Sequence, residues 1–164
     1  MPEVVSAGIL LFRRPAGHLE VLLGHPGGPW NARHDAGSWG IPKGQPHPTD
    51  PIDGAAADLL AVARREFEEE TGHRVPDGAL IWLGSVVQRG GKVVHAWAAE
   101  GDLDPAIARS NTFQAEWPPR SGRVATFPEI DRVAWFDPAE ARHRIRDAQQ
   151  SFIDRLEAAL APGS

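Results

Sequence analysis

Four glutamates crowd the end of a predicted helix, the position at which a helix accommodates negative charge least well. The run Arg65-Glu66-Phe67-Glu68-Glu69-Glu70-Thr71-Gly72 has the pattern of a helix that ends at Gly72. The carbonyl end of a helix dipole is negative, so carboxylates there are destabilising. Glu66 and Glu70 also repel each other as like charges four residues apart. We therefore expect a cation to offset these charges.

The helical repeat of about 100° per residue divides the four acids into two groups. Glu66, Glu69 and Glu70 fall on one arc, at the edge of the apolar stripe of the helix, whereas Glu68 points away. Carboxylate oxygens in this number favour Mg²⁺, with Mn²⁺ as a second choice, over zinc. Mg²⁺ commonly shares its coordination shell with substrate phosphates, so the pattern favours phosphate chemistry. A solvated acidic helix end without a ligand is the alternative.

The elements around this helix predict an α/β fold. A helix from near Asp53 to Gly72 follows a Gly/Pro-rich segment over residues 24–51. Residues 101–123 are expected to be mostly irregular, because Trp117-Pro118-Pro119 breaks any regular element. Predicted strands cover residues 4–12, 19–23, 80–87, 92–99 and 130–136, with hairpins across 14–18 and 88–91, and further helices cover 138–146 and 151–160.

The composition excludes several classes of function. The 164 residues include 22 acidic and 17 basic side chains, a formal net charge of −5, so we expect neither nucleic acid nor a membrane surface as a partner. There is no cysteine, which excludes disulfides and zinc thiolates. No apolar run is long enough to span a bilayer, and no basic leader pattern is present. We expect one cytoplasmic domain over residues 1–164, either a monomer or a homodimer.

The acidic run resembles a known family motif. Residues 65–72 are similar to the second half of the Nudix box, G-x5-E-x7-R-E-U-x-E-E-x-G-U, in which U is a bulky apolar residue. Gly44, in the segment Ile41-Pro42-Lys43-Gly44, is similar to the loop glycine that opens the box. The resemblance implies a Nudix α/β/α sandwich with a central mixed sheet. It also implies metal-dependent hydrolysis of nucleoside diphosphates linked to another moiety. Wider similarity to small bacterial predicted NTP pyrophosphohydrolases covers 6–8, 91–94, 116–123 and 135–136.

The first half of the box departs from the pattern. Arg65 follows Gly44 by 21 positions, whereas the box places its arginine 14 positions after the glycine, so seven residues are extra. Counting back from Arg65, the first box glutamate falls on Ala57, and counting forward from Gly44 it falls on Asp50. Three acids are alternatives for this missing glutamate, and the sequence does not choose among them: Asp50, Asp53 and Asp58.

The resemblance assigns roles to individual residues. Glu66, Glu69 and Glu70 match the positions that hold divalent metal, and Glu66 would also orient or deprotonate the attacking water. Arg65 would hold carboxylates in place from the flank. Gly44 would let the loop backbone approach the site. Further downstream acids that would serve as a base or ligand are Glu116 and Glu129.

Other side chains are candidates for contacts with the substrate. Lys43 would neutralise substrate phosphate. Trp39, together with Trp30 and Trp117, lies in a loop-like segment and would stack on a nucleobase. Three tryptophans have strand patterns and are expected in the core: Trp82, Trp97 and Trp135. Three loop histidines are candidates for a phosphate contact but show no metal-ligand spacing: His25, His34 and His47.

Two functions are consistent with this pattern. The first is a metal-dependent hydrolase that cleaves the diphosphate bridge of a nucleoside polyphosphate or another nucleoside diphosphate-linked substrate. The sequence does not choose among four substrate classes: a (d)NTP, a dinucleoside polyphosphate, ADP-ribose or a nucleotide sugar. The second is a Nudix-like nucleotide-binding sensor without turnover, supported by Ala57 and the seven extra residues. The complete set Glu66, Glu69 and Glu70 favours the enzyme.

Overall fold

A six-stranded mixed sheet forms the centre of the computed structural model, which describes residues 4–47 and 56–162. Its strand order is β4-β5-β1-β2-β8, and the short β3 pairs with β1. Neighbours run antiparallel except β1 and β5, which are parallel. The strands are β1 (Val5–Arg13), β2 (Glu20–Pro26), β3 (Lys43–Gly44), β4 (Leu80–Val87), β5 (Val93–Glu100) and β8 (Ile130–Phe136).

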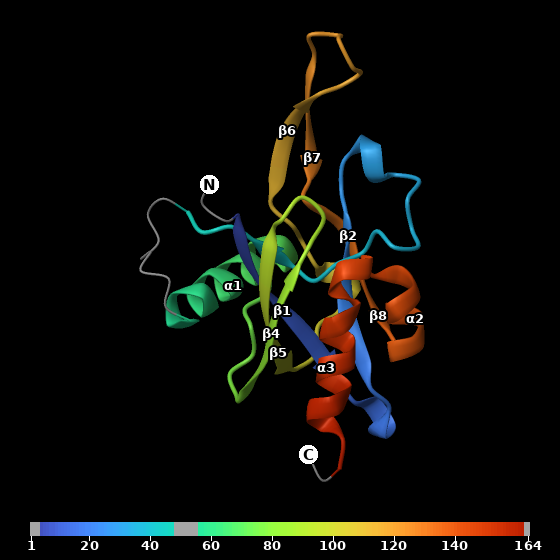
Figure 1. Cartoon of the computed structure of the whole chain (residues 1–164). Helices are drawn as coiled ribbons and strands as arrows, with labels where there is room; N and C mark the ends of the chain where they lie inside the picture. The colour runs from blue at the N-terminus through green and yellow to red at the C-terminus, as the bar shows by residue number, and fades with distance from the viewer. Residues whose placement is uncertain (1–3, 48–55, 163–164) are drawn as a thin grey trace.

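Helices cover both faces of this sheet, so the central strand β1 is buried from residue 6 to residue 12. Leu10 packs in one core with α3 (Gln150–Leu160), next to α2 (Pro138–Arg144). Ile9 packs in the other core with Phe67 of α1 (Ala56–Thr71). Figure 1 shows α1 on one side of the sheet and α3 on the other. The predicted α/β/α sandwich with a mixed central sheet is confirmed.

The long helix ends where the sequence predicts. Gly72 has φ = +76°, a conformation that favours glycine, and its N–H donates to the Glu68 carbonyl at 2.8 Å. Asp53, the predicted start of this helix, lies outside the described residues.

A second, two-stranded sheet corrects the prediction for part of residues 101–123: residues 112–116 form a strand, whereas most of the segment is irregular, as predicted. β6 (Thr112–Glu116) and β7 (Val124–Pro128) pair antiparallel and project from the body of the molecule. Phe113 lies opposite Phe127, with ring centroids 5.9 Å apart. β6 pairs with a strand that lies beyond the Pro-rich turn. Both strands are short, so neither shows a long alternation of apolar and polar residues that would mark it as a strand.

Trp82 corrects a second prediction, because it is 52% exposed and not in the core. It lies on the edge strand β4, where it stacks on His95 and contacts Trp97 at 4.7 Å between ring centroids. Trp97 is buried, as predicted. Trp135 is half-buried and donates its indole N–H to the Leu103 carbonyl at 3.0 Å.

Short 3-10 helices lie at Pro15–Gly17, Pro29–Asn31, Pro105–Ile107 and Asp147–Gln149. Within residues 4–47 and 56–162, no helix has the length and apolar character needed to cross a membrane.

Candidate active site

Three carboxylates of α1 line one hollow in the surface. Glu66, Glu69 and Glu70 all contribute to it, while Glu68 is exposed elsewhere on the helix. Glu66 is the most deeply placed, at 8% exposed. We call this the acidic hollow, and its lining is Ser6, Lys43, Gly44, Gln45, Pro46, His47, Glu66, Glu69, Glu70, Lys92, Asn111 and Glu129.

The segment around β3 lies directly over these acids. A Cβ built on Gly44 would lie 2.1 Å from the Glu66 carboxyl carbon, so a side chain at this position would displace the acid. The Lys43 backbone N–H donates to Glu70 Oε2 at 3.0 Å. Gly8 of β1 allows this approach, because a Cβ there would lie 2.5 Å from the Pro42 carbonyl oxygen. The glycine and the acids of the box are therefore in contact despite the extra residues between them.

Arg65 links the acids to the same segment. Its Nη1 donates to Glu66 Oε1 at 2.8 Å and lies 3.3 Å from Glu69 Oε2. Its Nη2 donates to the Gln45 carbonyl at 3.1 Å. The guanidinium therefore restrains two of the three carboxylates from the flank of the helix.

Burial sets the electrostatics of the hollow. Burial, with a contribution from the nearby Glu66, raises the pKa of Glu70 to about 8, against the opposing effect of the Lys43 N–H bond. Burial also raises the pKa of Glu66, opposed by Arg65. The pKa of Lys43 is lowered, first by burial and then by Arg146. A carboxylate that resists ionisation at neutral pH, as Glu70 does, is stabilised in its charged form by a bound divalent cation.

A set of metal-ligand atoms is already assembled. The ligand atoms of His47, Glu66 and Glu69 lie within 4.8 Å of one another. Arg65 Nη1 contacts all three residues, at 3.0 Å from His47 Nε2, 2.8 Å from Glu66 Oε1 and 3.3 Å from Glu69 Oε2. The carboxylate oxygens, with Glu70 beside them, are donors that suit Mg²⁺ or Mn²⁺. His47 was predicted only as a possible phosphate contact, because a residue 19 positions before Glu66 shows no recognisable ligand spacing. The chemistry of the three carboxylates thus fits a divalent ion, which would replace the Arg65 Nη1 contacts to Glu66 and Glu69.

Only one of the two predicted downstream acids reaches the site. Glu129, just before β8, lines the acidic hollow and contributes to the electrostatic environment of Glu70. Glu116 does not line it. Its carboxylate accepts the Arg120 N–H at 2.9 Å, on the projecting β6–β7 hairpin. The prediction that Glu116 serves as a downstream acid is therefore corrected, because the hairpin places it away from the acids of α1.

The acid that replaces the first box glutamate stays a prediction. Asp50 and Asp53 lie outside the described residues, and so does the side chain of Asp58. Most of the seven extra residues fall in the same interval.

The prediction that Trp39 contacts the substrate is wrong, because this residue is only 2% exposed. Phe136 and His25 pack edge-on against its ring, at 5.0 and 5.2 Å between centroids. Its indole N–H donates to Asp35 Oδ1 at 2.8 Å. No face of the ring is free to stack on a nucleobase. The exposed Trp30 and Trp117, in contrast, contact each other at 5.8 Å.

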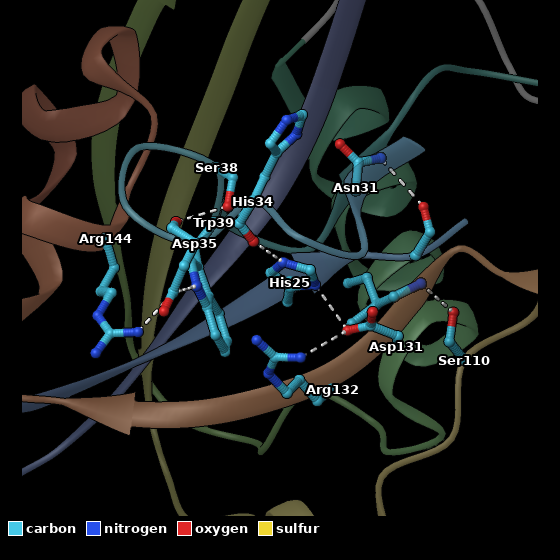
Figure 2. Close-up of polar contacts among 12 residues, drawn as sticks. His25, Asn31, His34, Asp35, Ser38, Trp39, Ser110, Asp131, Arg132 and Arg144 are labelled. Carbon is cyan, nitrogen blue, oxygen red and sulfur yellow. Dashed lines mark hydrogen bonds and ion pairs between the residues drawn. The ribbon is translucent and has the colours of Figure 1, made fainter. Parts of the chain in front are cut away.

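Buried polar contacts fasten the loop that leads into the site (Figure 2). His25 of β2 is fully buried, with Nδ1 2.8 Å from Asp131 Oδ1 and Nε2 2.6 Å from the His34 carbonyl. Both partners are acceptors, so both contacts are hydrogen bonds only when each ring nitrogen carries a hydrogen. On the other side of the loop, Asp35 accepts from Arg144 Nη1 at 2.5 Å. The loop is thereby held to β2, β8 and α2.

The hollow continues past the acids into two further hollows. A middle hollow shares Lys43, Glu70 and Glu129 with the acidic one, and is completed by Gly24, Pro26, Ser38, Gly40, Ile41, Ile130, Arg146 and Gln149. An outer hollow of about 770 Å³ shares Ser38 and Arg146 with the middle one and Lys92 with the acidic one. We refer to the three together as the cleft.

Comparison with known proteins agrees with this geometry. A model of the NUDIX domain matches residues 2–156. Comparison with curated proteins yields no match. Among solved structures, the NUDIX domain of Shewanella oneidensis NrtR, complexed with ADP ribose, has a TM-score of 0.65 at 18% identity, covering 98% of this chain and 90% of that one.

Two further structures have the same fold. A C. elegans Ap4A hydrolase has a TM-score of 0.62 at 21% identity, covering 94% of this chain and 97% of that one. A MutT protein from Methanosarcina mazei has a TM-score of 0.58 at 20% identity, covering 96% of this chain and 95% of that one. The NUDIX domain match supports pyrophosphohydrolase activity, and the solved structures show the same fold. The match over nearly the whole sequence shows that this chain belongs to the NUDIX family.

Proposed function

We propose that this protein is a divalent-metal-dependent hydrolase that cleaves the diphosphate bridge of a nucleoside polyphosphate or another nucleoside diphosphate-linked substrate and releases a nucleoside phosphate. One observation carries the proposal. Glu66, Glu69 and Glu70 meet in a single hollow, with the backbone of Lys43 and Gly44 packed directly against two of them. A merely solvated acidic helix end needs neither the burial nor this close backbone cover.

The residues that would hold Mg²⁺ or Mn²⁺ are Glu66, Glu69 and Glu70, with His47 beside them. When bound, such an ion neutralises phosphoryl oxygens and lowers the pKa of water at the site.

Side chains of the protein would orient the reactants and accept the proton. Glu66 would orient the attacking water and accept its proton, because its carboxylate is deep in the hollow and restrained by Arg65. The water oxygen would attack one phosphorus in line with the bridging bond, and the bridging oxygen would leave with the other phosphate. Lys43 would neutralise the charge of the substrate phosphates. Glu129, which lines the same hollow as Glu70, would be a further acid at the site. No covalent protein intermediate is needed.

Two of the similar structures support a nucleotide substrate. One was solved with ADP ribose and the other is named as an Ap4A hydrolase. Both compounds contain adenosine linked through a phosphate chain. The nucleotide-binding sensor is the alternative, and it differs from the enzyme in one respect only: it binds without turnover.

A substrate panel separates these functions. Nucleoside triphosphates, ADP-ribose, dinucleoside polyphosphates and nucleotide sugars would be incubated with Mg²⁺ or Mn²⁺, and released nucleoside phosphate would be measured. We expect turnover of at least one compound, and Glu69→Gln should lower kcat on the order of 100-fold or more.

Glu68→Gln is the matched control, since Glu68 lies on the same helix turn but is exposed away from the hollow. It should retain full activity. Binding of a nucleotide without release of product, across the panel and with both metals, would replace the enzyme with the sensor.

A further inference from the structure

The outer hollow contains positive charge that the metal site does not explain. Arg89 and Lys92 come from the β4–β5 turn, and Arg146 comes from the link between α2 and the short helix at Asp147–Gln149. Asp147 is the one acid of the outer hollow among the described residues. Within the described part of the chain, no carboxylate lies within ion-pair distance of these three cations.

The cations lead from the outer hollow to the acids. Lys92 lines the outer and the acidic hollow, and Arg146 lines the outer and the middle one. Lys43 lines the acidic and the middle hollow, so cations from three separate segments face the cleft: Lys43, Lys92 and Arg146. An anion in the cleft would relieve their mutual repulsion.

A buried amide fixes this arrangement. Gln149 is fully buried and accepts the Ile41 N–H at 3.0 Å, while its Nε2 donates to Gln88 Oε1 at 2.7 Å. The Gln88 N–H in turn donates to the Lys92 carbonyl at 2.7 Å, which ties in the β4–β5 turn. Arg146 is held through its own backbone, since its N–H donates to the Trp39 carbonyl at 2.8 Å. The backbone positions of the cations are thus set before any ligand binds, which lowers the entropic cost of binding.

We infer that the outer hollow receives phosphates of the substrate that lie beyond the cleaved bridge. The substrate class is then an extended polyphosphate of three or more phosphates, namely a nucleoside tri- or tetraphosphate or a dinucleoside polyphosphate, in preference to a two-phosphate compound such as ADP-ribose. This inference rests on the proposed function. The volume of about 770 Å³ is in the range of ligand sites and exceeds what water or a single phosphate needs.

The test compares substrates that differ in the number of phosphates. kcat/KM would be measured for ADP-ribose, ATP and diadenosine tetraphosphate with the wild-type protein and with Arg146→Met, Lys92→Met and Arg89→Met. We expect each substitution to lower kcat/KM for the tetraphosphate about tenfold or more, chiefly through KM, because a charge-assisted contact is lost. Arg89 lines the outer hollow alone, so the activity of Arg89→Met on ADP-ribose should change by less than about threefold.

Arg123→Met is the matched control, because Arg123 is exposed near the tip of the projecting hairpin and does not line the cleft. It should leave all three substrates unchanged. An equal loss on ADP-ribose and the tetraphosphate in Arg89→Met, or no loss on the tetraphosphate in any of the three cleft variants, would overturn the inference.

A binding measurement keeps this inference distinct from the proposed hydrolysis. Inorganic tripolyphosphate would be titrated calorimetrically into the wild-type protein, Arg146→Met and Arg123→Met, with and without Mg²⁺. Weaker binding by about tenfold in Arg146→Met alone supports the anion site even if no compound is hydrolysed. Binding that is the same in all three proteins would refute the site even if hydrolysis is found.

Discussion

Gly44 lies so close to Glu66 that a Cβ on the glycine would meet the carboxylate at 2.1 to 2.4 Å. The contact joins β3 to α1 across the extra residues, and it restricts where the carboxylate can lie. Gly44 does not adopt a positive φ. The requirement for glycine here is therefore the space that Glu66 occupies and not the backbone conformation.

Gly44→Ala should displace the Glu66 carboxylate and lower kcat on the order of 100-fold, while costing about 1–3 kcal/mol in the free energy of unfolding. The measurements are steady-state kinetics on the best panel substrate and chemical denaturation. Gly17→Ala is a useful comparison, since Gly17 has φ = +83° but nothing within 4 Å of an added Cβ. It should cost about 1–2 kcal/mol through backbone strain and leave kcat unchanged. Full activity of Gly44→Ala would show that the close contact has no role in catalysis.

Glu70 makes the stability of the folded protein depend on pH, and bound metal should weaken this dependence. Its pKa is raised from 4.5 to about 8, chiefly by burial, so the folded protein holds a proton that the unfolded chain releases above pH 4.5. The stabilisation from this proton is complete below pH 4.5 and is lost as the pH rises to about 8. In metal-free buffer, Tm should therefore fall across this interval.

Saturating Mg²⁺ should reduce this fall, because a bound cation stabilises the ionised carboxylate. Glu70→Gln should flatten the metal-free profile while keeping an acceptor for the Lys43 N–H. Thermal unfolding scans of both proteins, with chelator and with Mg²⁺, provide the check. A metal-free Tm that rises from pH 4.5 to pH 8 would contradict the assignment of Glu70 as a buried acid.

The arrangement of the acids on α1 could be predicted from the sequence, because it depends only on the repeat of a single helix. The positions of Glu66, Glu69 and Glu70 on one arc follow from the geometry of a single helix, as does the outward direction of Glu68. Helix ends, the two main hairpins and β8 follow from equally local patterns. The hairpin of β6 and β7 was missed because its register depends on a partner strand across a Pro-rich turn.

The parts of the cleft that come from distant segments were not predictable in this way. Trp39 lies in a Gly/Pro-rich stretch without periodicity, so its burial among His25, Phe136 and Asp35 is visible only in the folded chain. Glu116 and Glu129 look alike in sequence, and only the direction of the hairpin separates them. The same holds for Arg146, whose approach to Lys43 depends on how α2 packs on the sheet.

The contact between His25 and Asp131 should account for much of the order of the loop in Figure 2. Asp131→Ala would leave a fully buried imidazole nitrogen without its acceptor, at a cost of about 1–3 kcal/mol. Amide hydrogen exchange over residues 34–39 should also become faster, because the loop loses its link to β8. Asp154→Ala removes an exposed ion pair with Arg142 and should cost less than about 1 kcal/mol with no change in the loop. Equal effects of the two substitutions would mean that the buried histidine is not a tether.

Glu129 and Glu116 offer a direct test of which downstream acid serves the reaction. Glu129 lines two of the three hollows and lies near Glu70, whereas Glu116 is bonded to Arg120 on the hairpin. Glu129→Gln preserves size and hydrogen bonding but removes the charge. It should lower kcat about tenfold or more and change the dependence of kcat on Mg²⁺ concentration. Glu116→Gln should leave both unchanged, since its carboxylate faces no phosphate or metal position. If Glu116→Gln is the variant that loses activity, the hairpin must close onto the cleft during turnover, and the arrangement of β6 and β7 described here is the open form.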